Sequence, residues 1–265
     1  MKKIINKNKF GPWAIITGAS SGIGKGFARQ LASDGLNVIL VARRVSLLEE
    51  IGRQLAKEFG IEYRAIEADL ADESAIKKIT EITNDLDICL LVSNAGTGKP
   101  GKFLSFHEDE LKYILQLNAI SHLSLIHHFS KKMAILGRGG ILLTGAMGAS
   151  DGVPYMANEA GTKGYILSLG KSLHSEFKEF GINVTVLVTS PTETPVLSKL
   201  GFNKDNIPMK PVSIEQCVKE ALLALSANRV TIIPGFIYRI MNKLIPASMS
   251  REMMGKIMKK NNGIV

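Results

Sequence analysis

The stretch Trp13-Ala-Ile-Ile-Thr-Gly-Ala-Ser-Ser-Gly-Ile-Gly-Lys-Gly-Phe-Ala-Arg29 decides the fold of this chain. Its apolar beginning predicts a buried strand, and helical spacing of apolar residues starts at Ile23. Gly18 permits a tight turn, while Gly22 and Gly24 let backbone approach a pyrophosphate and let helix pack on sheet. The helix start adds free N–H groups and partial positive charge. The stretch therefore predicts a dinucleotide phosphate site rather than a plain glycine-rich turn.

Outside this stretch, apolar runs alternate with segments of helical spacing. The runs that predict strands lie near residues 13–17, 37–42, 62–67, 87–92, 140–144, 183–189 and 229–233. This alternation is typical of a parallel sheet with helices on both faces. We expect an α/β fold with a doubly wound, Rossmann-like parallel sheet. It would form a single domain over residues 1–265, with a core of about 11–235 and a basic, apolar C-terminal tail of about 236–265.

Composition restricts the class of protein. With 265 residues, 45% of them apolar, the chain can bury a large core. Cys89 and Cys217 suggest no disulfide framework, so we expect a reducing, cytoplasmic setting. No apolar run reaches the roughly 18 to 20 residues that span a bilayer. The basic N-terminus is not followed by the apolar region of a secretion signal.

The net charge of +9 lies at the two ends of the chain. Residues 1–9 hold four lysines, and residues 229–265 hold seven Lys or Arg against Glu252 alone. The middle of the chain is nearly neutral and lacks a basic patch with aromatic residues, so we expect no nucleic-acid partner.

Two motifs carry a resemblance to a known family. The turn has the form Thr-Gly-x-x-x-Gly-x-Gly from Thr17 to Gly24, and the fourth predicted strand ends in Asn94-Ala-Gly96. Both resemble the short-chain dehydrogenase/reductase family over about residues 11–235. The resemblance implies a cofactor site made by Thr17, Gly18, Ser20, Ser21, Gly22, Ile23, Gly24, Arg43, Arg44, Asp69, Leu70, Asn94, Ala95, Gly96, Lys163 and Thr194.

The resemblance also implies individual roles. Asp69 would hydrogen-bond the adenine, although a lone Asp at a strand end is often only an N-cap. Asn94 would stabilise the sheet end, and Gly96 would clear space beside the adenine ribose. Thr194 matches the residue that contacts the nicotinamide end, but Thr189-Ser190 replaces the family's Pro-Gly.

The end of the second predicted strand indicates the dinucleotide. Folds that prefer NAD place an acid there to bind the ribose 2′-hydroxyl. Ala42 stands at that place, and Arg43 and Arg44 follow, whose guanidinium groups suit a 2′-phosphate. We expect NADP(H) rather than NAD(H), unless both arginines are only solvated residues at a helix start.

The family's catalytic residues are only partly matched. Asn118 matches the asparagine that holds a water in the proton relay. Lys163 matches the lysine that binds the nicotinamide ribose and lowers the pKa of a tyrosine one turn away. Alignment of the strands puts Ala146 at the place of the family's serine, which polarises the carbonyl. Thirteen residues later, Glu159 stands at the place of the tyrosine.

These two replacements predict altered chemistry. Ala146 has no side-chain hydrogen bond to offer. Glu159 is spaced to pair with Lys163 on a helix, which favours an ionised carboxylate. An ionised carboxylate cannot donate a proton to a forming alkoxide and repels its charge. Tyr155, one helical turn before Glu159, is a potential substitute; otherwise Tyr155 and Tyr165 serve helix packing.

Three functions remain open at this point. The first is an NADP(H)-binding protein whose usual carbonyl/alcohol hydride transfer is lost or strongly altered, and which works by binding or sensing. The second is an active NADP-dependent oxidoreductase that uses Glu159 or an Asn118-held water on a bulky apolar carbonyl or alcohol. The third is a peripheral membrane or scaffold protein with a structural cofactor.

The remaining features concern partners. The tail mixes methionine and apolar residues with lysines, which suits a pocket lid, a dimer element or a helix on a membrane surface; a tail that packs on its own core is the commoner arrangement. The helix after Glu159 often builds a dimer face in the family, so we expect a homo-oligomer. No carboxylate or cysteine pattern accompanies His122, His127 and His128, so we expect no metal site.

Overall fold

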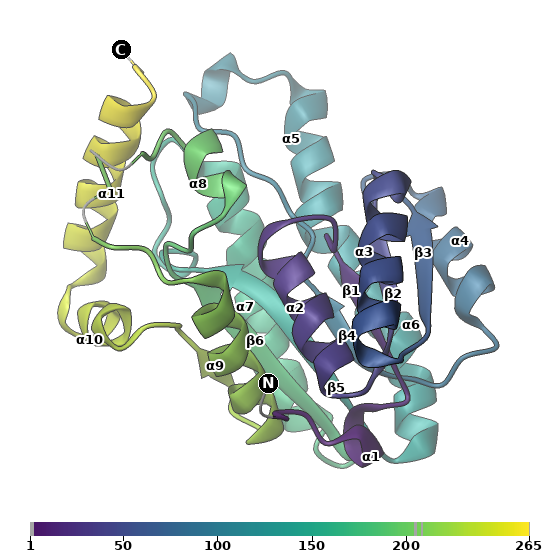
Figure 1. Ribbon diagram of the computed structural model, residues 1–265. Coiled ribbons are helices and arrows are strands. Elements are labelled where there is room, and N and C mark those ends of the chain that lie inside the picture. The colour runs from purple at the N-terminus through teal and green to yellow at the C-terminus, as the bar shows by residue number, and fades with distance from the viewer. Residues whose placement is uncertain (1–2, 204–205, 208, 265) are drawn as a thin grey trace.

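The computed structural model describes residues 3–203, 206–207 and 209–264. Within them, a seven-stranded parallel sheet runs in the order β3-β2-β1-β4-β5-β6-β7 (Figure 1). The strands are β1 (Trp13–Thr17), β2 (Asn37–Ala42), β3 (Tyr63–Glu67), β4 (Ile88–Ser93), β5 (Gly139–Ala146), β6 (Ile182–Thr189) and β7 (Thr231–Ile232). The predicted doubly wound α/β fold is confirmed, and each predicted strand begins and ends within two residues of the observed one.

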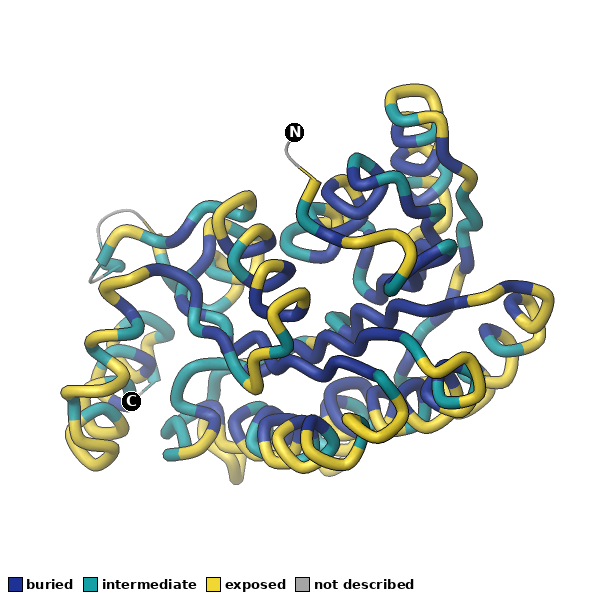
Figure 2. The backbone as a smooth tube through the Cα atoms, turned by 90° about the horizontal axis from the view of Figure 1, so that it is seen from below, coloured by how far each residue is buried: buried dark blue, intermediate teal, exposed yellow. Residues whose placement is uncertain are grey.

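Helices cover both faces of the sheet. On one face lie α2 (Gly22–Ser33), α3 (Val45–Phe59) and α9 (Ile214–Ser226), and on the other lie α4 (Ser74–Thr83), α6 (Ser121–Leu136) and α7 (Ala157–Glu176). The remaining helices are α1 (Lys7–Phe10), α5 (Glu108–Leu115), α8 (Pro195–Lys199), α10 (Phe236–Leu244) and α11 (Ala247–Asn261), with a short 3₁₀ turn at Phe103–Ser105. Figure 2 shows the buried strands between the two helical layers.

The strands in the middle of the sheet are largely apolar because both of their faces are buried, whereas the edge strand β3 also carries Arg64 and Glu67. In β1, Ala14 and Ile16 point into the core beneath α2, α3 and α9, whereas Ile15 points into the core beneath α4, α6 and α7. All three are fully buried. Side chains alternate across a strand, so a sheet covered on both sides needs an unbroken apolar run.

The segment between β4 and β5 contains a break in helical geometry. Helices α5 and α6 are joined without a loop by a π-helical turn at Gln116–Ile120. Asn118 lies in this turn and is fully buried. Such wider turns are frequent at functional sites because they aim one side chain out of the regular helical order.

The strand order indicates one end of the sheet as the expected place of a ligand. The chain reverses its direction of winding between β1 and β4, which are neighbours in the sheet although they are distant in sequence. In doubly wound folds, ligands bind beyond the carboxyl ends of the strands at this reversal. The residues that follow β1, β4 and β5 therefore lie where a ligand is expected.

None of the helices in the described residues combines the length and the apolar character required to cross a bilayer.

Candidate cofactor and catalytic site

The turn from β1 into α2 forms a cradle for an anion. Gly18 and Gly22 have φ angles of +67° and +54°, which side chains other than glycine rarely adopt. A Cβ atom at Gly24 would collide with the carbonyl oxygen of Gly18. The Ser21 side chain makes no capping bond to the helix, and the first N–H groups of a helix have no partner within it. The cradle therefore fits a phosphate group.

Hydrogen bonds join this turn to the ends of the neighbouring strands. Thr17 Oγ1 accepts from the backbone N–H groups of Asn94 and Ala95, both at 2.9 Å. Asn94 Nδ2 donates to Thr17 O at 3.2 Å, and Thr144 Oγ1 donates to Asn94 Oδ1 at 3.3 Å. Asn94 thus links the ends of β1, β4 and β5. Thr194, which caps α8, lies against Gly22, since a Cβ there would be 3.4 Å from the Thr194 methyl group.

The ends of β2 and β3 hold a contact that the sequence pattern does not indicate. Arg43 Nη1 donates to the Tyr113 hydroxyl at 3.1 Å, and that hydroxyl donates to Asp69 Oδ2 at 3.3 Å. Burial first, and then the Asp69 carboxylate, raise the pKa of Tyr113, which keeps its hydroxyl protonated. Arg44 Nη2 donates to Ser20 Oγ at 3.0 Å. Arg44 therefore lies beside the predicted cofactor loop, and Arg43 is linked through Tyr113 to Asp69.

The Asn118 and Lys163 side chains meet at Gly96. Asn118 Nδ2 donates to Thr97 O at 2.8 Å, and Asn118 Oδ1 accepts from Thr97 N at 2.9 Å. Lys163 Nζ donates to Thr144 O at 2.9 Å. A Cβ at Gly96 would lie 3.1 Å from Lys163 Nζ and 3.2 Å from Asn118 Oδ1. A side chain at Gly96 would therefore require both neighbouring side chains to shift slightly.

The expected pairing of Glu159 with Lys163 is wrong. No ion pair joins the two side chains, both of which the structure describes, because Lys163 Nζ is held by Thr144 O on β5. Glu159 Oε2 is buried without a hydrogen-bond partner and lies against Gly98. Burial raises the pKa of Glu159 to about 7, and Lys163 lowers it only in part. Burial also lowers the pKa of Lys163. Near neutral pH, a substantial share of Glu159 is therefore protonated.

Ala146 ends β5 at the carboxyl edge of the sheet. It pairs in register with Thr189 of β6, whose Oγ1 donates to Gly145 O at 2.9 Å. It lies two residues beyond Thr144, the residue whose carbonyl binds Lys163. The structure thus brings Ala146, Asn118 and Lys163 to one edge, with Glu159 one helical turn before Lys163.

Tyr155 does not lie on the helix with Glu159, contrary to expectation. Helix α7 begins two residues later, at Ala157, and Tyr155 has a φ angle of +64° in the preceding loop. Its carbonyl accepts from Gly101 N at 2.9 Å. Tyr155 and Glu159 both line a small cavity of about 30 Å³.

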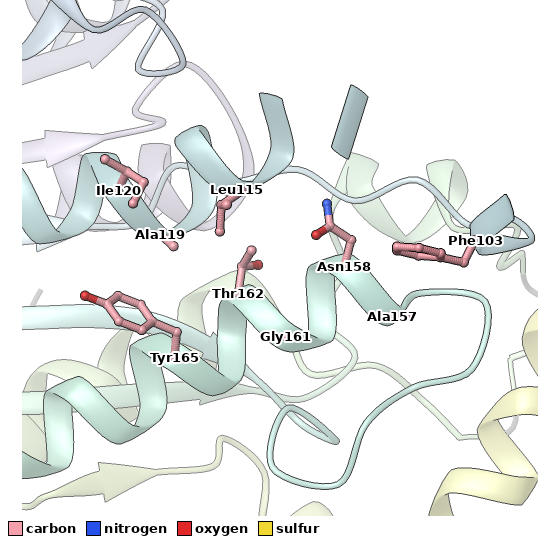
Figure 3. Close-up of a pocket in the computed structure, with 9 residues that line it drawn as sticks. All are labelled: Phe103, Leu115, Ala119, Ile120, Ala157, Asn158, Gly161, Thr162 and Tyr165. Atoms are coloured by element: carbon pink, nitrogen blue, oxygen red, sulfur yellow. The ribbon is translucent and has the colours of Figure 1, made fainter. Parts of the chain in front are cut away.

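A larger pocket lies on another side of α7, away from Glu159 and Lys163. Its volume is about 430 Å³. Figure 3 shows Thr162 and Tyr165 of α7 facing Leu115 and Ala119 across it. Tyr165 therefore belongs to this apolar pocket rather than to the candidate catalytic site.

The histidines have structural surroundings. His122 is fully buried, with Nδ1 2.9 Å from Ser93 Oγ and Nε2 2.8 Å from Ala95 O. Burial lowers the pKa of His122 to about 3, so the neutral ring donates through Nε2 and accepts at Nδ1. His127 and His128 are exposed. Across the described residues, no three His, Cys, Asp or Glu side chains gather as metal ligands would.

Comparison with known proteins identifies the family. A family model described as short chain dehydrogenase matches residues 12–205. This chain belongs to the short-chain dehydrogenase family. The resemblance seen in Thr17–Gly24 and Asn94–Gly96 is therefore confirmed.

Two relatives in the short-chain dehydrogenase family illustrate its range. The very-long-chain 3-oxoacyl-CoA reductase of Neurospora crassa is 34% identical over 225 residues, which cover 83% of this chain and 66% of that protein. The 7beta-hydroxysteroid dehydrogenase of Mediterraneibacter gnavus is 28% identical over 232 residues, covering 86% of this chain and 88% of that protein. The match thus spans slightly less than two thirds of the Neurospora protein.

Solved structures of this family share the fold. A 7beta-hydroxysteroid dehydrogenase studied for its stereoselectivity superposes with a TM-score of 0.85 at 23% identity, covering 95% of this chain and 98% of that one. A short-chain dehydrogenase from Sphingobium yanoikuyae, in complex with NADPH, superposes with a TM-score of 0.80 at 25% identity, covering 96% and 97%.

Proposed function

We propose that this short-chain dehydrogenase binds NADP(H) and transfers hydride with strongly altered proton chemistry, in which Glu159 replaces the family's tyrosine. The observation that carries the proposal is the buried Glu159 carboxyl, whose pKa of about 7 makes both protonation states available near neutral pH. A general acid or base works best when its pKa lies near the working pH.

The cofactor part of the proposal is supported by the cradle and the arginines. The N-terminus of α2 suits the pyrophosphate, and Arg43 and Arg44 suit a 2′-phosphate. Their neighbours Ser20 and Tyr113 hold both guanidinium groups at the edge of the crevice. The NADPH complex of the Sphingobium yanoikuyae protein is consistent with this assignment. When bound, the nicotinamide supplies the hydride.

The residues of this chain would handle the proton. In carbonyl reduction, the protonated Glu159 carboxyl donates its proton to the oxygen that becomes the alcohol, and the ionised carboxylate then takes a proton from water. The nearby cationic Lys163 stabilises that carboxylate, as its effect on the Glu159 pKa indicates. Asn118 fixes the loop at Thr97 that borders this space.

Ala146 sets a limit on the rate. Without a hydroxyl at this position, one donor to the developing negative charge is missing, which costs roughly a hundred- to a thousand-fold in turnover. We therefore expect slow reduction of simple carbonyl compounds.

The substrate class follows from the relatives. Their names describe a reductase of very-long-chain 3-oxoacyl-CoA and a dehydrogenase of 7beta-hydroxysteroids. Both substrates are bulky and largely apolar. We assign a bulky apolar carbonyl or alcohol to this chain as well.

A second candidate is a protein that binds NADP(H) as a sensor and has lost the reaction. The observation in its favour is that the Glu159 carboxyl packs against Gly98 and that Ala146 has no donor. A protein that only binds NADP(H) needs no proton donor, so both observations are compatible with a sensor.

Turnover of a panel of bulky ketones with NADPH separates the two candidates. We expect wild-type reduction to fall as pH rises through about 7, because the acid form of Glu159 is lost. Glu159→Gln should then lose roughly a hundred- to ten-thousand-fold, while Tyr155→Phe, a control in the same cavity, should be unchanged. If wild type is inactive at every pH and only Ala146→Ser with Glu159→Tyr restores reduction, the sensor is the correct function. NADPH binding, followed by fluorescence, serves as a separate readout.

The quaternary structure is part of the proposal. Leu115, Ile120 and Tyr165 are 45%, 38% and 41% exposed around the apolar pocket of α5 and α7. We expect a second copy of the chain to cover this face, which would form a homodimer.

A further inference from the structure

Helix α10 is held in one rotational position by polar contacts. The Tyr238 side chain is buried, and its hydroxyl donates to Lys210 O at 3.1 Å. Arg239 Nη1 donates to Glu220 Oε2 at 2.5 Å and to Ile233 O at 2.9 Å. These contacts fix which side of the helix faces the protein and which side faces out.

The side that faces out is apolar. Phe236, Ile237, Ile240 and Leu244 are 68%, 61%, 40% and 74% exposed. Their spacing puts them on one face of the helix, opposite Tyr238. A surface helix of a monomer normally presents its polar face to water. This reversed orientation marks α10 as a surface that binds something apolar.

Helix α11 extends the same surface and adds charge. Met249 and Met253 are 61% and 39% exposed. Lys256 and Lys260 follow on the same face, at spacings of seven and eleven residues from Met249. The opposite face of α11 packs on the loop before α7, since a Cβ at Gly255 would lie 3.1 Å from the Pro154 side chain. Figure 1 shows α10 and α11 together at one edge of the molecule, beyond α9 and far from β3.

The charge of this segment indicates its partner. Residues 229–265 contain seven Lys or Arg and a single acid, Glu252, which pairs with Lys256 at 2.7 Å. Lys243, Lys259 and Lys260 are exposed beside the apolar side chains. A second copy of this surface would bring two cationic faces together, whereas an anionic lipid surface complements both the charge and the apolar face.

We propose that the outer faces of α10 and α11 dock on an anionic lipid bilayer surface. The apolar side chains enter the boundary between headgroups and acyl chains, and the lysines contact the lipid headgroups. The helices lie in the plane of the interface and do not span the bilayer. The homodimer face proposed above uses α5 and α7, so the two surfaces do not compete.

Cosedimentation of the full chain with lipid vesicles tests the proposal. We expect binding to vesicles of phosphatidylcholine with 30% phosphatidylglycerol, weak binding to pure phosphatidylcholine, and release by high salt. Ile237→Ser with Leu244→Ser should weaken binding at least tenfold, because burying one side chain of this size strengthens binding by roughly tenfold or more. Lys243→Gln with Lys260→Gln should weaken it by roughly fivefold per lysine.

The matched control uses Leu104 and Ile135, which are 95% and 86% exposed on other parts of the surface. Leu104→Ser with Ile135→Ser should leave vesicle binding unchanged. All variants should keep the wild-type circular dichroism spectrum and melting temperature, since the changed side chains are exposed.

Three results would overturn the proposal. They are a wild-type chain that stays in the supernatant with anionic vesicles, a control pair that loses binding as strongly as the α10 pair, and an α10 pair that binds like wild type. If vesicle binding is absent and the α10 pair instead lowers the mass measured by light scattering, this surface is a contact between copies of the chain.

Discussion

One tyrosine connects two predicted cofactor residues, Arg43 and Asp69, that follow different strands. Arg43 follows β2 and Asp69 follows β3, while Tyr113 comes from α5. The Tyr113 hydroxyl accepts from Arg43 and donates to Asp69. The arginine is thereby oriented without a ligand, so less side-chain freedom would be lost on binding the 2′-phosphate that we propose for it.

The dinucleotide preference can be reversed at Arg43. We expect wild type to bind NADPH at least several-fold more tightly than NADH, and Arg43→Glu to abolish or reverse this preference, because a carboxylate repels the 2′-phosphate and accepts from a 2′-hydroxyl. Titration calorimetry measures both constants. Arg53→Glu, an equal charge change on the exposed side of α3, is the control. Equal affinities of wild type for the two cofactors would contradict the assignment.

The resemblance to the family proposed the residues of the candidate site but not the contacts between them. Asn94, Asn118 and Lys163 could be proposed because each matches a residue of the family by its place in the sequence. The interaction of Glu159 with Lys163 was mispredicted because helical spacing takes no account of Thr144, whose carbonyl holds the lysine. Tyr113 was missed because its partner Arg43 lies 70 residues away in the chain.

Among the elements, α2 has no room for a side chain at Gly24 near its start. The backbone of Gly18 fills the space where a side chain at Gly24 would begin. The turn and the helix can therefore approach each other only through a residue without a Cβ.

Gly24→Ala should separate the turn from the helix. We expect a loss of roughly 1–3 kcal/mol in stability from overpacking, together with a large loss of NADPH affinity. Gly161→Ala is a matched control in α7, because a Cβ there meets no atom within 4 Å. The control should gain roughly 0.5–1 kcal/mol. Urea unfolding measures the change in stability, and NADPH fluorescence measures the change in affinity. An unchanged NADPH affinity of Gly24→Ala would show that NADPH does not bind at this turn.

Strands were predictable from sequence, whereas the orientation of α10 was not. The runs that became β1 and β2 are apolar except for Thr17 and Asn37 at their ends, and such runs are typical of strands with both faces buried. In α10, the apolar residues recur at helical spacing, and this spacing is compatible with an apolar face that is turned either toward the protein or toward solvent. Only the tertiary contacts of Tyr238 and Arg239 decide between the two.

For the whole molecule, the buried Glu159 carboxyl links stability to pH. Its pKa rises from 4.5 to about 7 on folding. The native state therefore binds a proton that the unfolded chain has already lost between these values. Below about pH 4.5, Glu159 is protonated in both states and does not lower the free energy of unfolding. This free energy falls as pH rises through about 7, and above that pH the buried carboxylate lowers it by about 3 kcal/mol.

Glu159→Gln should remove this dependence. We expect the variant to gain stability relative to wild type between pH 5 and pH 8.5, by up to about 3 kcal/mol. Urea unfolding at both pH values measures the difference. Lys256→Gln, which removes an exposed charge on α11, should show no such change between the two pH values. A gain for Glu159→Gln that is the same at both pH values would mean that the carboxyl is not protonated in the native state.

The π-helical turn at Gln116–Ile120 has a consequence for how the gene of this protein can vary. Such a turn contains one residue more than the α-helical turn it replaces, and each residue of an α-helix rotates the following side chains by about 100°. A deletion of Ala119 would make one regular helix from α5 to α6. Leu125 and Phe129 would keep facing the sheet, because the residue removed is the extra one of the wider turn. Asn118 would lose the direction that lets it bind Thr97. The loss of this one codon should therefore leave the packing of α5 and α6 in place and remove only the Asn118 contact.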